Sequence, residues 1–93
     1  MTENGPPWTA TVVVRTRTDR LAEMLERSLR PEAEREVPRA RATLTRTASD
    51  SVQLAIHARD TGAMRAALNT YLGWVALSLA AARAAAEHSA SSA

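Results

Sequence analysis

The chain has 93 residues, a formal net charge of +2 and no cysteine. This length fits one small domain, and a sequence without cysteine excludes disulfides and thiolate metal sites. Hydrophobic residues make up 45% of the chain, but many are alanine and aromatics reach 3%, so the core of large side chains is thin. A domain this small is often marginal by itself, and we expect oligomerisation to supply further burial.

The sequence also bears on where the protein works. No charged start followed by an apolar core precedes the first predicted element, so we expect no secretory signal. The most apolar run, residues 72–86, is shorter than the roughly 20 residues that a bilayer span needs, and it contains Arg83. These features predict a soluble, cytoplasmic protein without membrane contact.

Residues 8–17 alternate β-branched with small or polar side chains, which is typical of a strand. Ala10, Val12 and Val14 are expected to face the core. The preceding residues 1–7 contain Asn-Gly-Pro-Pro, which favours a flexible lead-in.

A first helix is predicted over residues 20–29, with Thr18 and Asp19 at the position of the N-terminal cap. Four apolar side chains recur at helical spacing and form one stripe: Leu21, Met24, Leu25 and Leu29. Pro31 is expected to stop this helix, and residues 32–37 to form an acidic connector.

Two further strands are predicted over residues 39–48 and 52–58, because both segments alternate apolar and polar side chains. Ser49, Asp50 and Ser51 between them have turn chemistry, so the pair is expected to form an antiparallel hairpin. The side chains expected to face the core are Ala40, Ala42, Leu44, Val52, Leu54, Ile56 and Ala58.

A long second helix is predicted from Thr61 to about residue 86, with Asp60 or Thr61 capping its first turn. One apolar stripe consists of Met64, Leu68, Tyr71, Leu72, Val75 and Leu79. Trp74 and Leu77 lie off this stripe, so the helix is apolar over more than one face and is expected to have two partners. Residues 89–93 are expected to form a polar, disordered tail.

The order of elements is therefore β-α-β-β-α, in a single α+β domain over residues 8–88. One apolar face per strand and one buried stripe per helix predict a three-stranded antiparallel sheet with two helices packed on one face. The opposite face of the sheet is then left outside, and its basic side chains are Arg15, Arg17, Arg39, Arg41 and His57.

This basic face admits two interpretations. Arginines with threonine neighbours bind phosphate oxygens without reading sequence, which suits RNA recognition by Arg15, Arg17, Arg39 and Arg41. The alternative is an ordinary solvated strand face, since this surface lacks the exposed aromatics that stack on unpaired bases. The sequence leaves both open.

The sequence offers little basis for catalysis or for a bound cofactor. Ser49, Ser51, His57 and Asp60 are residue types found in hydrolytic sites, but the serines suit a turn and Asp60 suits a cap. Two histidines without cysteine give no metal-ligand spacing, and the three glycines are too scattered for a phosphate loop. We therefore expect a protein that is not an enzyme, with no catalytic, metal or cofactor site of its own.

A second line of polar and then very small side chains runs along the long helix: Arg65, Asn69, Gly73, Ala76 and Ala80. Relative to alanine, glycine costs about 1 kcal/mol in a helix interior and asparagine about 0.6 kcal/mol, so local propensity favours neither. One interpretation is that another helix approaches closely here, with Asn69 hydrogen-bonding across the contact and Trp74 and Leu77 as apolar anchors. The other is drift in an alanine-rich helix, with Trp74 folded over the sheet edge.

The start of this helix resembles the C-terminal helix of the small dimerisation subunit of the KEOPS complex, a Pcc-type family also called CTAG/LAGE-like. The residues that carry the resemblance are Asp60, Met64, Arg65, Ala67, Leu68, Asn69, Tyr71, Leu72 and Trp74. The chain length and the order of elements also agree with this family. One departure is Gly73, which occupies a position where the family often carries a long basic side chain.

The resemblance implies a noncatalytic scaffold that dimerises, with itself or with a small paralogue. It implies that the helices hold the threonylcarbamoyl-transferase subunit of KEOPS, through residues that here include Arg65, Asn69, Gly73, Trp74 and Leu77. The complex modifies the adenosine beside the tRNA anticodon to threonylcarbamoyladenosine, and ATP and metal belong to the partner subunits. Contact with tRNA is then expected within the complex.

The alternative function is a stand-alone small RNA-binding module of KH-like outline. The clamp loop of such domains needs Gly-x-x-Gly, and the sequence has none. Tight binding of tRNA by the isolated chain would favour this module, whereas weak binding that a partner protein restores would favour the scaffold.

Overall fold

The computed structural model describes residues 8–35 and 37–91. In chain order the elements are β1 (Trp8–Arg15), α1 (Asp19–Ala33), β2 (Ala40–Ala48), β3 (Ser51–Ala58) and α2 (Thr61–Ser91). The expected order β-α-β-β-α is confirmed. The expected lead-in, residues 1–7, lies outside the described residues.

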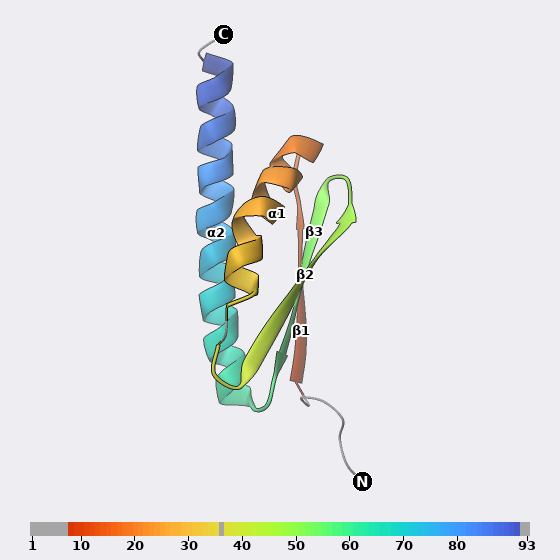
Figure 1. Cartoon of the computed structure of the whole chain (residues 1–93), viewed down its shortest axis with the longest axis vertical. Coiled ribbons are helices and arrows are strands. Elements are labelled where there is room, and N and C mark those ends of the chain that lie inside the picture. The colour runs from red at the N-terminus through yellow and green to blue at the C-terminus, as the bar shows by residue number, and fades with distance from the viewer. Residues whose placement is uncertain (1–7, 36, 92–93) are drawn as a thin grey trace.

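The three strands form one antiparallel sheet in the order β1-β3-β2, so β3 is the central strand. Trp8 pairs with Ala58 and Arg15 with Ser51 across β1 and β3, while Ala40 also pairs with Ala58 across β2 and β3. Both helices lie on the same side of the sheet, as Figure 1 shows. This confirms an α+β fold with two helices on one sheet face.

The core lies between this sheet face and the helices, and its inward side chains follow the predicted alternation. Leu44, Val52, Leu54 and Ile56 are buried, and Val12 packs against them. The largest fully buried side chains are Tyr71, Leu25, Ile56 and Val52. Alanine fills much of the rest, at Ala22, Ala33 and Ala67, so few large side chains hold the core together.

Helix α1 is longer than the sequence predicts, because Pro31 lies inside it and does not stop it. Proline removes the amide that would bond to the carbonyl four residues earlier, but it leaves the following turn free to form. The Glu34 amide donates to the Arg30 carbonyl at 3.1 Å, and Ala33 is buried. Packing of Ala33 on the core thus supports one further half-turn beyond the proline.

Strand β2 begins one residue later than predicted, because Arg39 lies in a turn. The Ala40 amide donates to the Val37 carbonyl at 3.1 Å, and Arg39 has a φ of 63°. Pro38 followed by a residue with positive φ is the pattern of a type II turn. Strand β1 ends at Arg15, two residues before the predicted end. The Thr16 amide still donates a hydrogen bond to the Asp50 carbonyl at 2.8 Å.

Helix α2 buries one face, made of Ala63, Ala67, Tyr71, Val75 and Ala82. Met64, Leu68 and Leu79 of the predicted stripe pack against the core, but Leu72 is 44% exposed and does not belong to it. The helix continues to Ser91, whereas the sequence predicts an end near residue 86. Because alanine and serine supply no stop signal, the helix extends into part of the expected tail.

Candidate partner and nucleic-acid surfaces

Helix α2 lies at the side of the molecule, and no other described residue covers the face opposite its buried stripe (Figure 1). We define the outer face of α2 by its exposed residues Arg65, Asn69, Leu72, Gly73, Ala76, Leu77 and Ala80. Leu77 is 69% exposed and Leu72 is 44% exposed. From residue 72 to residue 80 this face carries no charged or hydrogen-bonding side chain, so it offers an apolar strip of about two helical turns.

Gly73 lies in the middle of this face without any packing reason within the chain. A Cβ built at Gly73 would meet nothing within 4 Å, leaving out the helix's own nearby backbone. Alanine would therefore fit and would favour the helix by about 1 kcal/mol. The glycine is thus unexplained by this chain alone and is compatible with close approach by another molecule.

Trp74 lies beside the outer face and is half-buried. Its ring meets Tyr71 edge-on, with centroids 5.6 Å apart and an interplanar angle of 72°. On its other side the Arg35 guanidinium lies 5.6 Å from the ring centroid, and Arg35 also pairs with Glu32 at 3.6 Å. Trp74 therefore already joins α2 to the end of α1, and only its remaining exposed part is open to a partner.

Tyr71 presents a feature that the sequence does not reveal. Its side chain is 1% exposed, and its hydroxyl has no hydrogen-bond partner among the described residues. Burial raises the pKa of this hydroxyl, because the charged phenolate is disfavoured away from water. The apolar ring contributes core volume, which periodicity predicts, whereas the state of the hydroxyl depends on tertiary packing.

Asp60 precedes α2 and caps its first turn, so of the two predicted caps, Asp60 and Thr61, it is Asp60 that binds the free amide. Its Oδ1 accepts a hydrogen bond from the Ala63 amide at 2.7 Å, and its Oδ2 pairs with the Arg39 guanidinium. The Ala63 hydrogen bond and the Arg39 charge lower the pKa of Asp60. Asp60 is thus a structural cap, and Arg39 forms an ion pair with it.

The four arginines predicted for RNA contact do not form one patch. Arg41 lies opposite His57 in the sheet, and His57 lies opposite Thr9, so these three form one row on the outer sheet face. Arg15 pairs with Ser51 at the other end of β3. Arg15 lies six positions after Thr9 along β1, which corresponds to about 20 Å.

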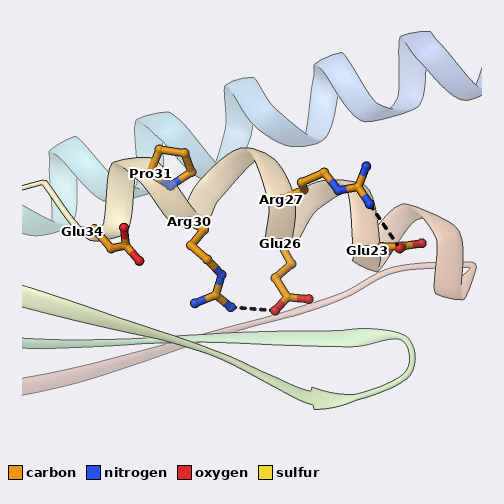
Figure 2. Close-up of a pocket in the computed structure, with 6 residues that line it drawn as sticks. All are labelled: Glu23, Glu26, Arg27, Arg30, Pro31 and Glu34. Carbon is orange, nitrogen blue, oxygen red and sulfur yellow. Dashed lines mark hydrogen bonds and ion pairs between the residues drawn. The ribbon is translucent and has the colours of Figure 1, made fainter.

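A shallow groove runs along α1, where acidic and basic side chains alternate (Figure 2). The residues that line it are Glu23, Glu26, Arg27, Arg30, Pro31 and Glu34. Glu26 accepts from Arg30 at 2.6 Å and from Arg46 of β2 at 3.0 Å, and these bonds lower its pKa. Ion pairs therefore neutralise most of the charged side chains that line the groove.

Sequence analysis does not single out Arg46, although it shares the inward side of β2 with Leu44. Besides Glu26, its guanidinium donates to the carbonyls of Ala48 and Ser49, at 3.1 and 2.7 Å. The signal that would have found it is an arginine at an inward strand position, which needs an acidic partner on the covering helix.

The hydrolytic residue types lie in separate places. Ser51 donates to Asp50 at 3.1 Å in the hairpin turn, His57 lies on the outer sheet face and Asp60 caps α2. Within residues 8–35 and 37–91, no three histidine, aspartate or glutamate side chains are grouped so that they could hold a metal ion. In the same residues, no helix combines the length and apolar character of a membrane span.

Comparison with known proteins adds one match. A family model described as transcription factor Pcc1 matches residues 9–83, which extends from β1 well into α2. No curated protein matches the chain. The match covers all five elements, so it does not depend on the α2 motif alone.

Proposed function

The chain belongs to the Pcc1 family, the family of a KEOPS subunit, and we propose that it is a noncatalytic scaffold subunit. In this proposal it forms a dimer, with itself or a small paralogue, and holds the threonylcarbamoyl-transferase subunit of the complex. It thereby supports threonylcarbamoyladenosine modification of tRNA in the cytoplasm. The chemistry, ATP and metal belong to the partner.

The observation that supports this proposal is the outer face of α2. Soluble surfaces rarely leave large aliphatic side chains together in a strip without polar neighbours, unless the strip is an interaction site. Leu72 and Leu77 flank Gly73 and Ala76, so a partner helix can approach the backbone between two apolar side chains. Asn69, which is exposed one turn before Gly73, supplies a hydrogen bond that fixes the register of that helix.

The sheet supports the dimer part of the proposal. Strands β1 and β2 are the two edges, and each presents unpaired backbone groups to solvent. Pairing of one edge with that of a second copy or paralogue gives a six-stranded sheet and removes an exposed edge from each protomer. The small core makes such additional burial valuable for stability.

A double substitution on the outer face tests the scaffold. Asn69→Ala with Leu77→Ala removes the proposed hydrogen bond and the most exposed apolar anchor, and neither side chain is part of the core. We expect binding to the transferase subunit to weaken at least tenfold in titration calorimetry, since truncating a central anchor typically costs about 2 kcal/mol. Circular dichroism and solution mass should show an unchanged fold and dimer.

Thr45→Ala is the control, because Thr45 is exposed on the sheet face that points away from the helices. It should leave the affinity unchanged. Equal affinity of the double variant and the parent chain would refute the assignment of the outer face of α2 as the binding surface.

A further inference from the structure

The sheet register brings basic side chains together at one end of the uncovered sheet face. Thr9, His57 and Arg41 lie directly opposite one another on β1, β3 and β2. Directly opposite residues in antiparallel strands share a face, with Cβ atoms about 5 Å apart. A single ligand group can therefore contact all three side chains.

Arg59 directly follows β3, two residues after His57. Its amide donates to the Arg39 carbonyl at 3.0 Å, which holds it next to the start of β2, beside this row. We call Thr9, Arg41, His57 and Arg59 the basic end of the sheet.

The charges at the basic end are available to a ligand. Among the ion pairs of the described residues, Arg39 is paired with Asp60, whereas Arg41 and Arg59 are in none, and both are exposed. His57 and Thr9 add hydrogen-bonding groups beside them.

The opposite end of the same face carries fewer basic side chains in one row. Arg15 lies opposite Ser51, and Ser51 lies opposite Ala48. The two rows between the ends are Thr11-Ala55-Thr43 and Val13-Gln53-Thr45, which carry no charge. The row Thr9-His57-Arg41 thus has basic side chains on two neighbouring strands, whereas the row Arg15-Ser51-Ala48 has one.

From this geometry we propose that the basic end is a binding site for the phosphate backbone of RNA, with Arg41 and Arg59 on successive phosphates and His57 and Thr9 beside them. The inference deepens the proposed function, on which the choice of tRNA rests. Of the four arginines predicted for RNA contact it keeps Arg41, leaves out Arg15, Arg17 and Arg39, and adds Arg59. Arginine with hydroxyl neighbours on a flat sheet binds phosphate oxygens without reading bases. A membrane surface is disfavoured, because lipid recognition uses clusters of four to eight basic residues.

Paired substitutions at the two ends test the site. The probe is unmodified tRNA transcript, titrated with the full chain and followed by fluorescence anisotropy between about 50 and 200 mM salt. Arg41→Gln with Arg59→Gln should weaken binding about tenfold at the lowest salt and reduce the salt slope by about 1 to 2, because one or two phosphate contacts are lost. Arg15→Gln with Arg17→Gln removes the same charge from the other end and should change the slope by less than about 0.5.

Several results would overturn the site. An equal loss of affinity in both double variants would indicate diffuse attraction. An unchanged salt slope in Arg41→Gln with Arg59→Gln would show that these arginines do not contact phosphates, and no binding by the parent chain at the lowest salt would show that the chain has no such site. Polyglutamate serves as a second probe. If Arg41→Gln with Arg59→Gln loses polyglutamate binding but keeps tRNA binding, the basic end binds an acidic protein instead. Anionic vesicles serve as a third probe, and stronger binding to them than to tRNA would also contradict the proposal.

The same variants separate this inference from the scaffold. Arg41 and Arg59 lie outside α2, so Arg41→Gln with Arg59→Gln should retain full affinity for the transferase subunit. Loss of that affinity together with tRNA binding would show that the variant is damaged or that the basic end contacts the partner, and would overturn the RNA site. Failure of the Asn69→Ala with Leu77→Ala test leaves the tRNA titration unaffected.

Discussion

At Arg39 the backbone adopts a conformation that side chains with a Cβ rarely tolerate. Its φ of 63° lies in the left-handed region, which costs an L-residue roughly 1 to 2 kcal/mol. The turn from Val37 to Ala40 requires this conformation, because Pro38 occupies the preceding position and the Ala40 amide bonds back to Val37. The guanidinium of Arg39 in turn reaches Asp60 at the start of α2.

Glycine at this position should make the protein more stable. Arg39→Gly removes the left-handed strain of about 1 to 2 kcal/mol, whereas the added freedom of the unfolded chain offsets roughly 0.5 to 1 kcal/mol. The lost ion pair is exposed and contributes little. We expect a net gain of about 0.5 to 1 kcal/mol in the free energy of unfolding, measured by urea denaturation.

Arg39→Ala is the matched control, because it loses the same ion pair but keeps the Cβ and hence the strain. It should not be more stable than the parent chain. If alanine and glycine stabilise the protein equally, the positive φ of Arg39 is not the source of the gain.

At the scale of elements, a single substitution on the outer face of α2 should raise the stability of the fold and weaken partner binding. Gly73→Ala adds a methyl group into open space and removes the helix penalty of glycine. We expect the free energy of unfolding to rise by about 1 kcal/mol, which corresponds to a melting temperature about 4 to 8 °C higher for a domain of this size. Differential scanning calorimetry measures this shift.

The same substitution should weaken binding to the transferase subunit if a helix backbone approaches at Gly73. Ala76→Gly provides the reciprocal control on the same face, since it should lower stability without adding bulk. Higher stability of Gly73→Ala with unchanged affinity would indicate that no close approach occurs there.

Sequence periodicity predicts the elements well and their ends less well. Alternation identifies the inward faces of all three strands because each strand has one buried face. Besides the ends of β1 and α2, errors occur at Pro31, Arg39 and Leu72. There the outcome depends on contacts made elsewhere: burial of Ala33, the turn before Ala40 and the position of α2 on the core. Local propensity contains no information about those contacts.

At the scale of the whole molecule, an ion pair joins α1 to the sheet. Glu26 of α1 accepts hydrogen bonds from Arg30 of the same helix and from Arg46 of β2. These bonds lower the pKa of Glu26 below its ordinary value of 4.5. A carboxyl with a depressed folded-state pKa stabilises the fold fully above its unfolded pKa, and that contribution is lost as the pH falls through the folded pKa.

Removal of this carboxylate should therefore flatten the acid dependence of stability. From about pH 6 to about pH 3, the urea midpoint of the parent chain should fall more than that of Glu26→Gln, because glutamine has no charge to lose. Glu23→Gln is the control, since Glu23 pairs with Arg27 at 3.5 Å in an exposed helix pair. Parallel curves for Glu26→Gln and the parent would show that the link to Arg46 does not depend on charge.

Of the two candidate surfaces, the sequence predicts the outer face of α2 but not the arrangement of the basic sheet face. The exposure of Asn69, Gly73 and Leu77 follows from helical spacing once the buried stripe is known. The division of the basic sheet face into two ends does not, because it depends on the strand register, which places Arg41 beside His57 and Arg15 some 20 Å away. Spacing along the chain gives no access to that distance.

The central place of β3 in the sheet constrains when the strands can pair during synthesis on the ribosome. Strand β1 is synthesised first, yet every one of its ladder partners belongs to β3, so it remains without a partner until residues 51–58 have been translated. The hairpin of β2 and β3 is contiguous in sequence, whereas β1 reaches its partner β3 only across α1 and β2. The oldest strand of the nascent chain is thus incorporated after both of the younger ones have been made.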